Sequence, residues 1–133
     1  MKVNLVTLTL VTIMGLSGCE SQKTRGSFVK GQIIEYAPIV LKESVTEEIL
    51  LNSSNVLQRD FLTKQQGFIK RILVKKSDRE YVDIVIWDSK ENADKAVEHS
   101  MQSKACEDYF NCMKNSEASD VLHFEVLAEY GNR

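Results

Sequence analysis

The sequence contains few of the residues from which metal and redox sites are usually built. It has two histidines, three cysteines and one tryptophan among 133 residues. No CxxC pair is present, so a zinc site would lack ligands. The formal net charge is −2, and no stripe of basic residues offers the electrostatic footprint that nucleic acid requires. We therefore expect no metal, no cofactor and no nucleic-acid partner.

Long apolar runs are also missing, although the N-terminus carries a short one. Lys2 is followed by a nearly uncharged apolar run at residues 5–16 and then by the small residues Ser17 and Gly18. A membrane-spanning helix needs about 20 apolar residues, so this run is too short to stay in a membrane. The layout is typical of a secretory signal peptide. We predict that residues 1–18 form this signal and are removed.

The four residues Leu16-Ser17-Gly18-Cys19 resemble the lipobox of bacterial lipoproteins. This resemblance implies that Cys19 becomes the new N-terminus and carries acyl chains such as palmitate, which anchor the protein durably to a membrane of the cell envelope. Glu20, rather than Asp, follows the cysteine. In a Gram-negative source this implies the outer membrane, with the domain facing the periplasm. The alternative is a simple secreted protein with an incidental cysteine.

The rest of the chain, roughly 115 residues, is long enough for one domain. Residues 20–31 are polar and contain glycine, so we interpret residues 19–31 as the lipidated cysteine and a flexible tether. Residues 32–133 then form the domain. Its charge stays mildly negative, because Lys2 is the only charged residue in the signal peptide.

The spacing of apolar residues changes along the domain between the period of a strand and the period of a helix, and it predicts the order of the elements. We expect a strand at residues 33–41 with Pro38 at an edge or bulge, a helix at 45–63, and a hairpin of strands 68–76 and 79–88. A helix with Ala93, Ala96, Val97 and Met101 on one stripe, a shorter helix at 105–114 and a strand at 122–129 follow. Ser44 and Glu47 have the spacing of a capping box for the first helix, and Asp88 or Ser89 is expected to cap the second.

This order, βαββαβ, predicts an α+β domain of the ferredoxin-like class, with helices on one face of an antiparallel sheet. In the strand at 79–88 both faces are largely apolar. Such a strand belongs at the centre of a sheet. The fold alone does not indicate a function, because many unrelated activities share it.

The amino-acid sequences of three segments point to a particular family more specifically than the fold does. Gly67-Phe68, the run Tyr81 to Ser89, and the segment from Met101 to Met113 around Ala105-Cys106 and Tyr109-Phe110 resemble the dimeric α/β-barrel proteins of the antibiotic biosynthesis monooxygenase-like superfamily. The resemblance covers about residues 33–130. It implies a homodimer in which two sheets pack into a barrel, with a pocket between each sheet and its helices.

That superfamily does not imply a single reaction. Some members oxidise aromatic substrates without metal or flavin, others degrade haem, and many have no known activity. Haem-degrading members have a tryptophan and a haem-ligating histidine where this chain has Ala96 and Cys106, so the resemblance does not extend to the haem branch. His99 lies in the same helix, but we interpret it as a solvated surface residue.

Two residues are candidates for proton transfer. His123 interrupts the last apolar strand, and a histidine side chain changes its charge near neutral pH. A hydrogen-bonded or solvent-facing histidine is the structural alternative. Asp83 lies among aromatic residues on one strand face and is the second candidate base. Its structural alternative is a buried ion pair with Arg71 of the neighbouring strand, which we favour.

Aromatic residues supply the candidate ligand pocket: Trp87, Tyr36, Tyr81 and Phe68, with Arg71 beside them. The alternative is that these aromatics are simply core.

Cys106 and Cys112 are six residues apart, about 9 Å along a helix axis. A disulfide requires Cα atoms within about 7 Å, so the bridge forms only if the helix breaks between them, and two buried thiols are the other outcome.

From these features we predict a lipid-anchored envelope protein whose dimeric domain binds a small apolar or aromatic molecule. A cofactor-independent monooxygenase that acts on a phenol or quinol, with His123 or Asp83 as base, is the first alternative. A structural lipoprotein without a ligand is the second. The sequence does not supply a complete set of nucleophile, base and orienting group, so catalysis stays a hypothesis.

Overall fold

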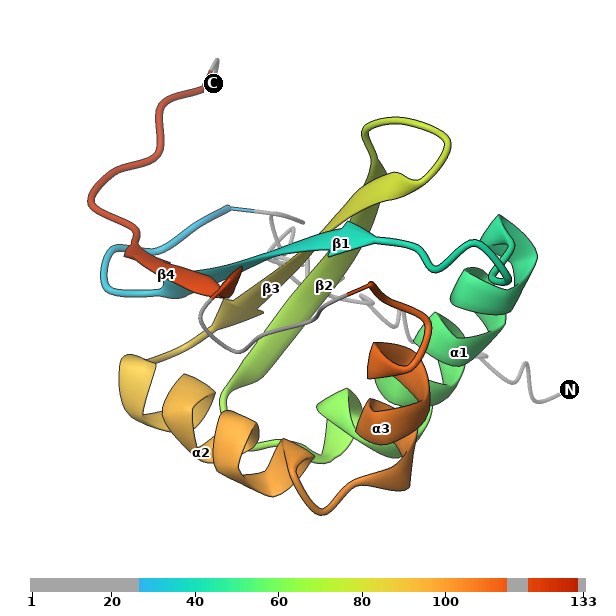
Figure 1. Cartoon of the computed structure of the whole chain (residues 1–133). Coiled ribbons are helices and arrows are strands. Elements are labelled where there is room, and N and C mark those ends of the chain that lie inside the picture. The colour runs from blue at the N-terminus through green and yellow to red at the C-terminus, as the bar shows by residue number, and fades with distance from the viewer. Residues whose placement is uncertain (1–26, 115–119, 132–133) are drawn as a thin grey trace, which may run out of the picture.

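The computed structural model describes residues 27–114 and 120–131. Within these residues a four-stranded antiparallel sheet is covered on one side by three α-helices (Figure 1). The elements in chain order are β1 (Ile33–Val40), α1 (Glu47–Asp60), the short 3-10 helix η1 (Leu62–Lys64), β2 (Phe68–Lys75), β3 (Glu80–Trp87), α2 (Lys90–Ser100), α3 (Lys104–Phe110) and β4 (Leu122–Glu125). The predicted ferredoxin-like order is confirmed.

The strands lie in the order β2-β3-β1-β4. The apolar strand β3 therefore has a neighbour on each side, and β2 and β3 form the expected hairpin. Strand β4 pairs with β1 only from Ile33 to Tyr36. Pro38 lies beyond this pairing, where β1 has no contact with β4, which suits a residue without a backbone N–H group.

Each of the three α-helices begins at a hydroxyl side chain that accepts a hydrogen bond from a backbone N–H group of the first turn. The caps are Thr46 for α1, Ser89 for α2 and Ser103 for α3. Ser89 was one of the two expected caps. The capping box at Ser44 was wrong, because the helix begins two residues later and Thr46 accepts from the N–H of Ile49 instead.

Alternation along the strands separates the two faces of the sheet. The face toward the helices contains the centre of the core, where Trp87, Leu50 and Tyr109 are almost completely buried. The opposite face, which we call the open face, is also apolar. Its side chains, assigned from the register, are Ile34, Tyr36, Pro38, Val40, Lys70, Ile72, Val74, Val82, Ile84, Ile86, Leu122 and Phe124, all apolar or aromatic except Lys70.

The structure corrects several expected boundaries. Strand β4 ends at Glu125 rather than at Glu129. Helix α3 ends at Phe110 rather than at Lys114; the Phe110 side chain is exposed, whereas Met113 is buried. Met101 caps the end of α2 and is exposed, so the buried stripe of α2 contains Ala93 and Ala96 without it. No helix in the described part of the chain is long and apolar enough to cross a membrane.

Candidate functional site

The predicted site residues do not all lie on the same face of the sheet. From the strand register, His123, Asp83, Trp87 and Arg71 point toward the helices. Tyr36 alternates with Glu35 on β1 and therefore belongs to the open face. The candidate base residues are thus brought to one side of the sheet, whereas the aromatic set is divided.

Asp83 is the partner of Arg71. Its two carboxylate oxygens accept from Nε and Nη2 of Arg71 at 2.7 and 2.6 Å, and both side chains are buried. Arg71 also donates to the backbone oxygen of Ser54 at 3.0 Å, and the hydroxyl of Tyr109 donates to Asp83 at 2.8 Å. The favoured ion-pair interpretation of Asp83 is confirmed. A catalytic function of Asp83 stays a prediction.

The electrostatics of this cluster stabilise the charged pair. Burial acts to lower the pKa of Arg71, but the hydrogen bonds and the charge of Asp83 outweigh it and raise that pKa. Burial, followed by the charge of Asp83, raises the pKa of Tyr109 far above that of an ordinary phenol. Tyr109 therefore stays protonated and serves as a hydrogen-bond donor to the ion pair.

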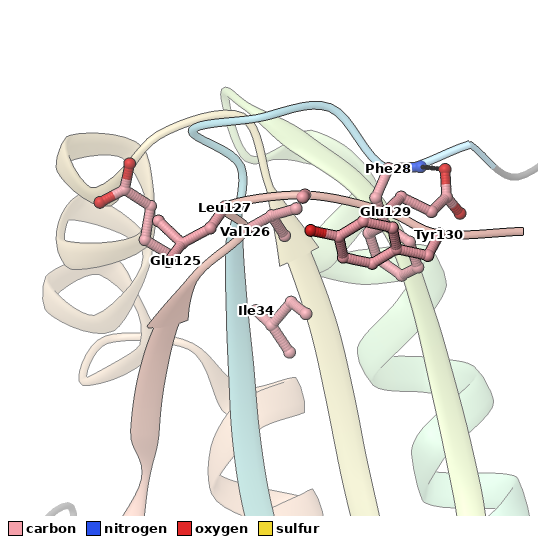
Figure 2. A pocket seen from close by; sticks show the side chains of 8 residues that line it. Phe28, Ile34, Glu125, Val126, Leu127, Glu129 and Tyr130 are labelled. Atoms are coloured by element: carbon pink, nitrogen blue, oxygen red, sulfur yellow. Dashed lines mark hydrogen bonds between the residues drawn. The ribbon is translucent and has the colours of Figure 1, made fainter.

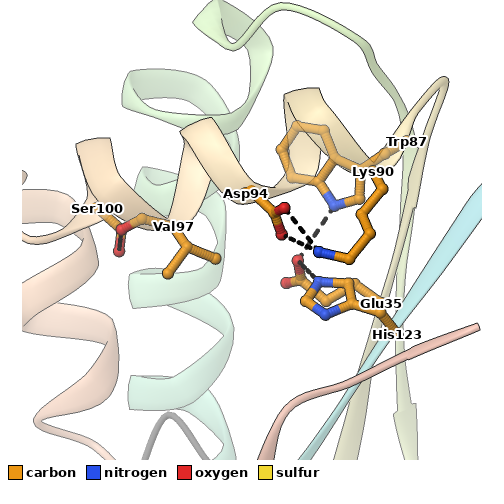
Figure 3. Close-up of polar contacts among 7 residues, drawn as sticks. All are labelled: Glu35, Trp87, Lys90, Asp94, Val97, Ser100 and His123. Carbon is orange, nitrogen blue, oxygen red and sulfur yellow. Dashed lines mark hydrogen bonds and ion pairs between the residues drawn. The ribbon is translucent and has the colours of Figure 1, made fainter.

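A second polar cluster joins β4 to β1 (Figure 3). Nε2 of His123 lies 3.2 Å from Oε2 of Glu35, and Nε1 of Trp87 donates to the same oxygen at 3.2 Å. Burial raises the pKa of the Glu35 carboxyl, while the hydrogen bond and charge of His123 act in the opposite direction. Glu35 therefore supplies the orienting group for His123 that the sequence did not reveal.

Sequence reasoning missed Glu35, although one signal was present. Glu35 has the same strand parity as Ile33 and Ile39, both of which are buried toward the helices. A carboxylate at an inward-facing position of an apolar strand requires a partner. Its partner His123 lies 88 residues further along the chain.

The aromatic residues do not form one pocket. Trp87 and Tyr81 are 1 and 4 % exposed and are packed into the core, with the Tyr81 hydroxyl donating to Glu47. Phe68 packs edge-on against Trp87 with ring centroids 5.9 Å apart. Tyr36 lies on the other face of the sheet. The core interpretation fits Trp87 and Tyr81 in this arrangement.

Cys106 and Cys112 are free and buried, so they do not form the disulfide that we considered. The end of α3 at Phe110 does not bring them together, because Asn111 continues in the α conformation. The Cys112 thiol instead donates to the backbone oxygen of Asp108 at 3.5 Å. Among the residues that the structure describes, no group of acidic, histidine and cysteine side chains is arranged to hold a metal ion.

A hollow lies elsewhere, between the two ends of the described chain. It is a groove of about 480 Å³, which we call the tail groove (Figure 2). It is lined by Phe28, Ile34, Glu125, Val126, Leu127, Ala128, Glu129 and Tyr130. No sequence pattern had indicated it, because most of its residues come from the last expected strand, while Phe28 belongs to the expected tether and Ile34 to the first strand.

Hydrogen bonds between the two chain segments build the walls of the tail groove. Ser27 Oγ and the N–H of Phe28 donate to the carboxylate of Glu129 at 2.8 and 2.9 Å. The backbone of Val126 exchanges hydrogen bonds with Gly31 and Gln32. Residues 27–31 of the expected tether therefore contact the domain directly.

Comparisons with known proteins support the fold. No protein-family model and no curated protein matches the sequence. SnoaB, a cofactor-independent oxygenase from Streptomyces nogalater, is 14% identical with a TM-score of 0.54, and the match covers 76% of this chain and 96% of that one. A protein from Bordetella bronchiseptica assigned as an antibiotic biosynthesis monooxygenase is 16% identical with a TM-score of 0.54, covering 74% of this chain and 100% of that one.

A third solved structure agrees with these two. A protein from Shewanella loihica assigned as a monooxygenase is 13% identical with a TM-score of 0.51, and the match covers 77% of this chain and 100% of that one. The similarity extends over nearly the full length of each of these proteins, but the identities are too low to transfer an activity. The described domain has the ferredoxin-like fold of antibiotic biosynthesis monooxygenase-like proteins.

Proposed function

We propose that the chain is a lipid-anchored, homodimeric protein of the cell envelope that binds a small apolar or aromatic molecule. The tail groove carries the ligand-binding part of this proposal. Its volume of about 480 Å³ lies within the range of roughly 300–1,000 Å³ that is usual for small-molecule sites. Most of its side chains are apolar; Glu125 and Glu129 also line it, and the Glu129 carboxylate accepts hydrogen bonds from Ser27 and Phe28.

The position of the groove agrees with a ligand that comes from a membrane. Phe28 lies in the wall of the groove and only nine residues after Cys19. An extended chain of nine residues spans at most about 32 Å. An acylated Cys19 would therefore hold the groove close to the bilayer, where apolar molecules are concentrated.

The anchor is tested by replacing Cys19 with Ser. The variant should lose labelling by radioactive palmitate and should leave the membrane fraction, because the remaining chain has no apolar run long enough to span a bilayer. A variant that stays in the membrane fraction and is still labelled would contradict the lipobox interpretation.

Ligand binding is tested on a soluble chain without residues 1–19, using the neutral fluorescent probe N-phenyl-1-naphthylamine. The variants Leu127→Ser and Tyr130→Ser should each weaken binding about fivefold to tenfold, since each removes apolar contact area at the groove. Both side chains are largely exposed, so folding should be unaffected. Met101→Ser is the matched control, because Met101 is equally exposed but lies outside the groove.

Equal binding by all variants would remove the tail groove from the proposal. Absence of binding by any apolar or aromatic compound would favour the structural lipoprotein.

One observation favours the monooxygenase alternative, namely the carboxylate of Glu35 that holds His123. Oxygen uptake with phenols and quinols should then fall about 100-fold in His123→Gln, with Asp83→Asn measured beside it. Equal uptake by all three proteins would exclude both residues as the base.

A further inference from the structure

A second, smaller cavity lies on the helix-facing side of the sheet, whereas Ile34 of the tail groove belongs to the open face. It has a volume of about 200 Å³ and is lined by Ser54, Asn55 and Gln58 of α1 and by Arg71 and Leu73 of β2. Arg71 and Leu73 belong to the helix-facing side of the edge strand β2. This cavity, which we call the arginine cavity, therefore opens between the first helix and the edge of the sheet.

Arg71, which lines the arginine cavity, is a buried cation that can donate one more hydrogen bond than its partners use. The Arg71 side chain is only 5% exposed. Its hydrogen bonds to Asp83 and to the backbone oxygen of Ser54 use three of the five N–H groups that a guanidinium carries. The Tyr109 hydroxyl is a further hydrogen-bond partner of Arg71, which leaves one N–H group of the guanidinium without a hydrogen bond within residues 27–114 and 120–131. This group is a strong donor for a carbonyl oxygen.

The walls of the cavity add side chains of matching chemistry. Asn55 and Gln58 are three residues apart on α1 and lie on the same side of the helix. A side-chain amide offers both an acceptor and two donors. Leu73 provides an apolar surface on the opposite wall. The combination suits a ligand that has a carbonyl group, an N–H group and a small apolar part.

The charge of the ligand follows from the ion pair. Asp83 already neutralises Arg71, and Tyr109 packs against both. A carboxylate ligand would bring an additional negative charge close to Asp83 in a partly enclosed site, where charges repel more strongly than in water. A neutral carbonyl compound uses the same donor without that cost.

We propose that the arginine cavity binds a small neutral amide, whose carbonyl oxygen accepts from Arg71 and whose N–H group donates to the side-chain oxygen of Asn55 or Gln58. The cavity has room for about six water molecules, at roughly 30 Å³ each, and so for a compound of the size of benzamide. This site is independent of the tail groove and does not depend on the proposed function.

The test is an NMR titration of the ¹⁵N-labelled soluble chain with benzamide and, separately, with benzoate. Benzamide should cause saturable shifts of the backbone amides at residues 54–58 and 71–73, and benzoate should bind at least tenfold more weakly. Gln58→Ala and Asn55→Ala should each weaken benzamide binding about threefold to tenfold, the effect of one lost hydrogen bond. Gln102→Ala is the control, because Gln102 is exposed and lies outside the cavity.

Several results would overturn the proposal. They are the absence of saturable shifts, equal affinity for benzoate and benzamide, or an equal loss of affinity in the Gln102 variant. Leu127→Ser, the tail-groove variant, should leave benzamide binding unchanged. The two sites can therefore fail or succeed separately.

Discussion

His123 of β4 and Glu35 of β1 meet on the helix-facing side of the sheet, with 3.2 Å between Nε2 and Oε2. The pair connects the short edge strand β4 to the strand that holds it. Both side chains are only partly accessible, at 23 and 17 %. Figure 3 shows the second ring nitrogen of His123 pointing away from Glu35. On α2, Lys90 forms an ion pair with Asp94 in the same view.

The stability contributed by Glu35 should decrease as the pH rises. Burial raises the pKa of Glu35 above 4.5, against the opposing effect of His123, so the native state binds this proton more tightly than the unfolded chain does. The contribution is complete below pH 4.5 and is lost as the pH rises through the native pKa. Glu35→Gln removes this titration, and its amide oxygen still accepts from Trp87.

We therefore expect the free energy of unfolding of the wild type, relative to Glu35→Gln, to fall between pH 4.5 and neutrality. Urea denaturation of both proteins over this range measures the difference, in which the other carboxyl groups cancel. A difference that stays constant with pH would contradict the prediction.

Removing one partner of the Arg71–Asp83 pair should strongly destabilise the protein. Asp83→Asn leaves the guanidinium buried without its counter-charge, which should lower the free energy of unfolding by about 3–5 kcal/mol. Glu91→Gln is the control, because Glu91 pairs with Lys95 on the surface with 76 and 51% of these side chains exposed. Its cost should be below about 1 kcal/mol. Chemical denaturation at pH 7 distinguishes the two, and equal losses would show that the pair is not buried in solution.

Gly67 should not tolerate a side chain. Its φ angle is +78°, and an added Cβ would lie 2.3 Å from Oδ1 of Asp88 and 2.6 Å from Cβ of Asn92. Gly31 also has a positive φ angle, +90°, but its added Cβ would meet nothing within 4 Å. Gly31→Ala should therefore cost only the backbone strain of roughly 1 kcal/mol, and Gly67→Ala distinctly more. Thermal denaturation of the two variants compares them, and similar melting temperatures would refute the steric argument.

The open face should be covered by a second copy of the chain. Five of its apolar side chains, Val40, Ile72, Val74, Leu122 and Phe124, are 39–52 % exposed. An apolar patch of this kind marks an interaction surface. Sedimentation of the soluble chain at micromolar concentration should give twice the monomer mass, and Ile72→Asp or Phe124→Asp should reduce it to one. Ile49→Asp, on a comparably exposed residue of α1, should leave the dimer intact, and a monomeric wild type would contradict the proposal.

The parts of the fold that follow from hydrophobic periodicity were predictable. The apolar run of β3 indicated a central strand, and the switch of period along the chain gave the element order. The start of α1 was misplaced because Ser44 and Thr46 are both competent caps, and only the tertiary path of the chain selects Thr46. Whether Cys106 and Cys112 form a disulfide could not be predicted for the same reason, because it depends on how the chain continues beyond α3.

The site was only partly predictable, because it depends on contacts between residues distant in sequence. Asp83 and Arg71 could be paired from the hairpin, since their strands are adjacent. Glu35 and His123 could not be paired, because their contact requires the register between the first and last strands. The tail groove depends on bonds between Ser27, Phe28 and Glu129, which lie about a hundred residues apart in the chain.

The hydrogen bonds of Ser27 and Phe28 with Glu129 make the two ends of the sheet different from each other. They hold both ends of the described chain beside Ile33, whereas the β2-β3 turn lies at the other end of the sheet (Figure 1). Strand β1 has eight residues, about 26 Å of length. A molecule suspended by its N-terminus would therefore carry a label at Tyr130 on its membrane-proximal side and a label at Ser77 roughly one strand length deeper in the aqueous space.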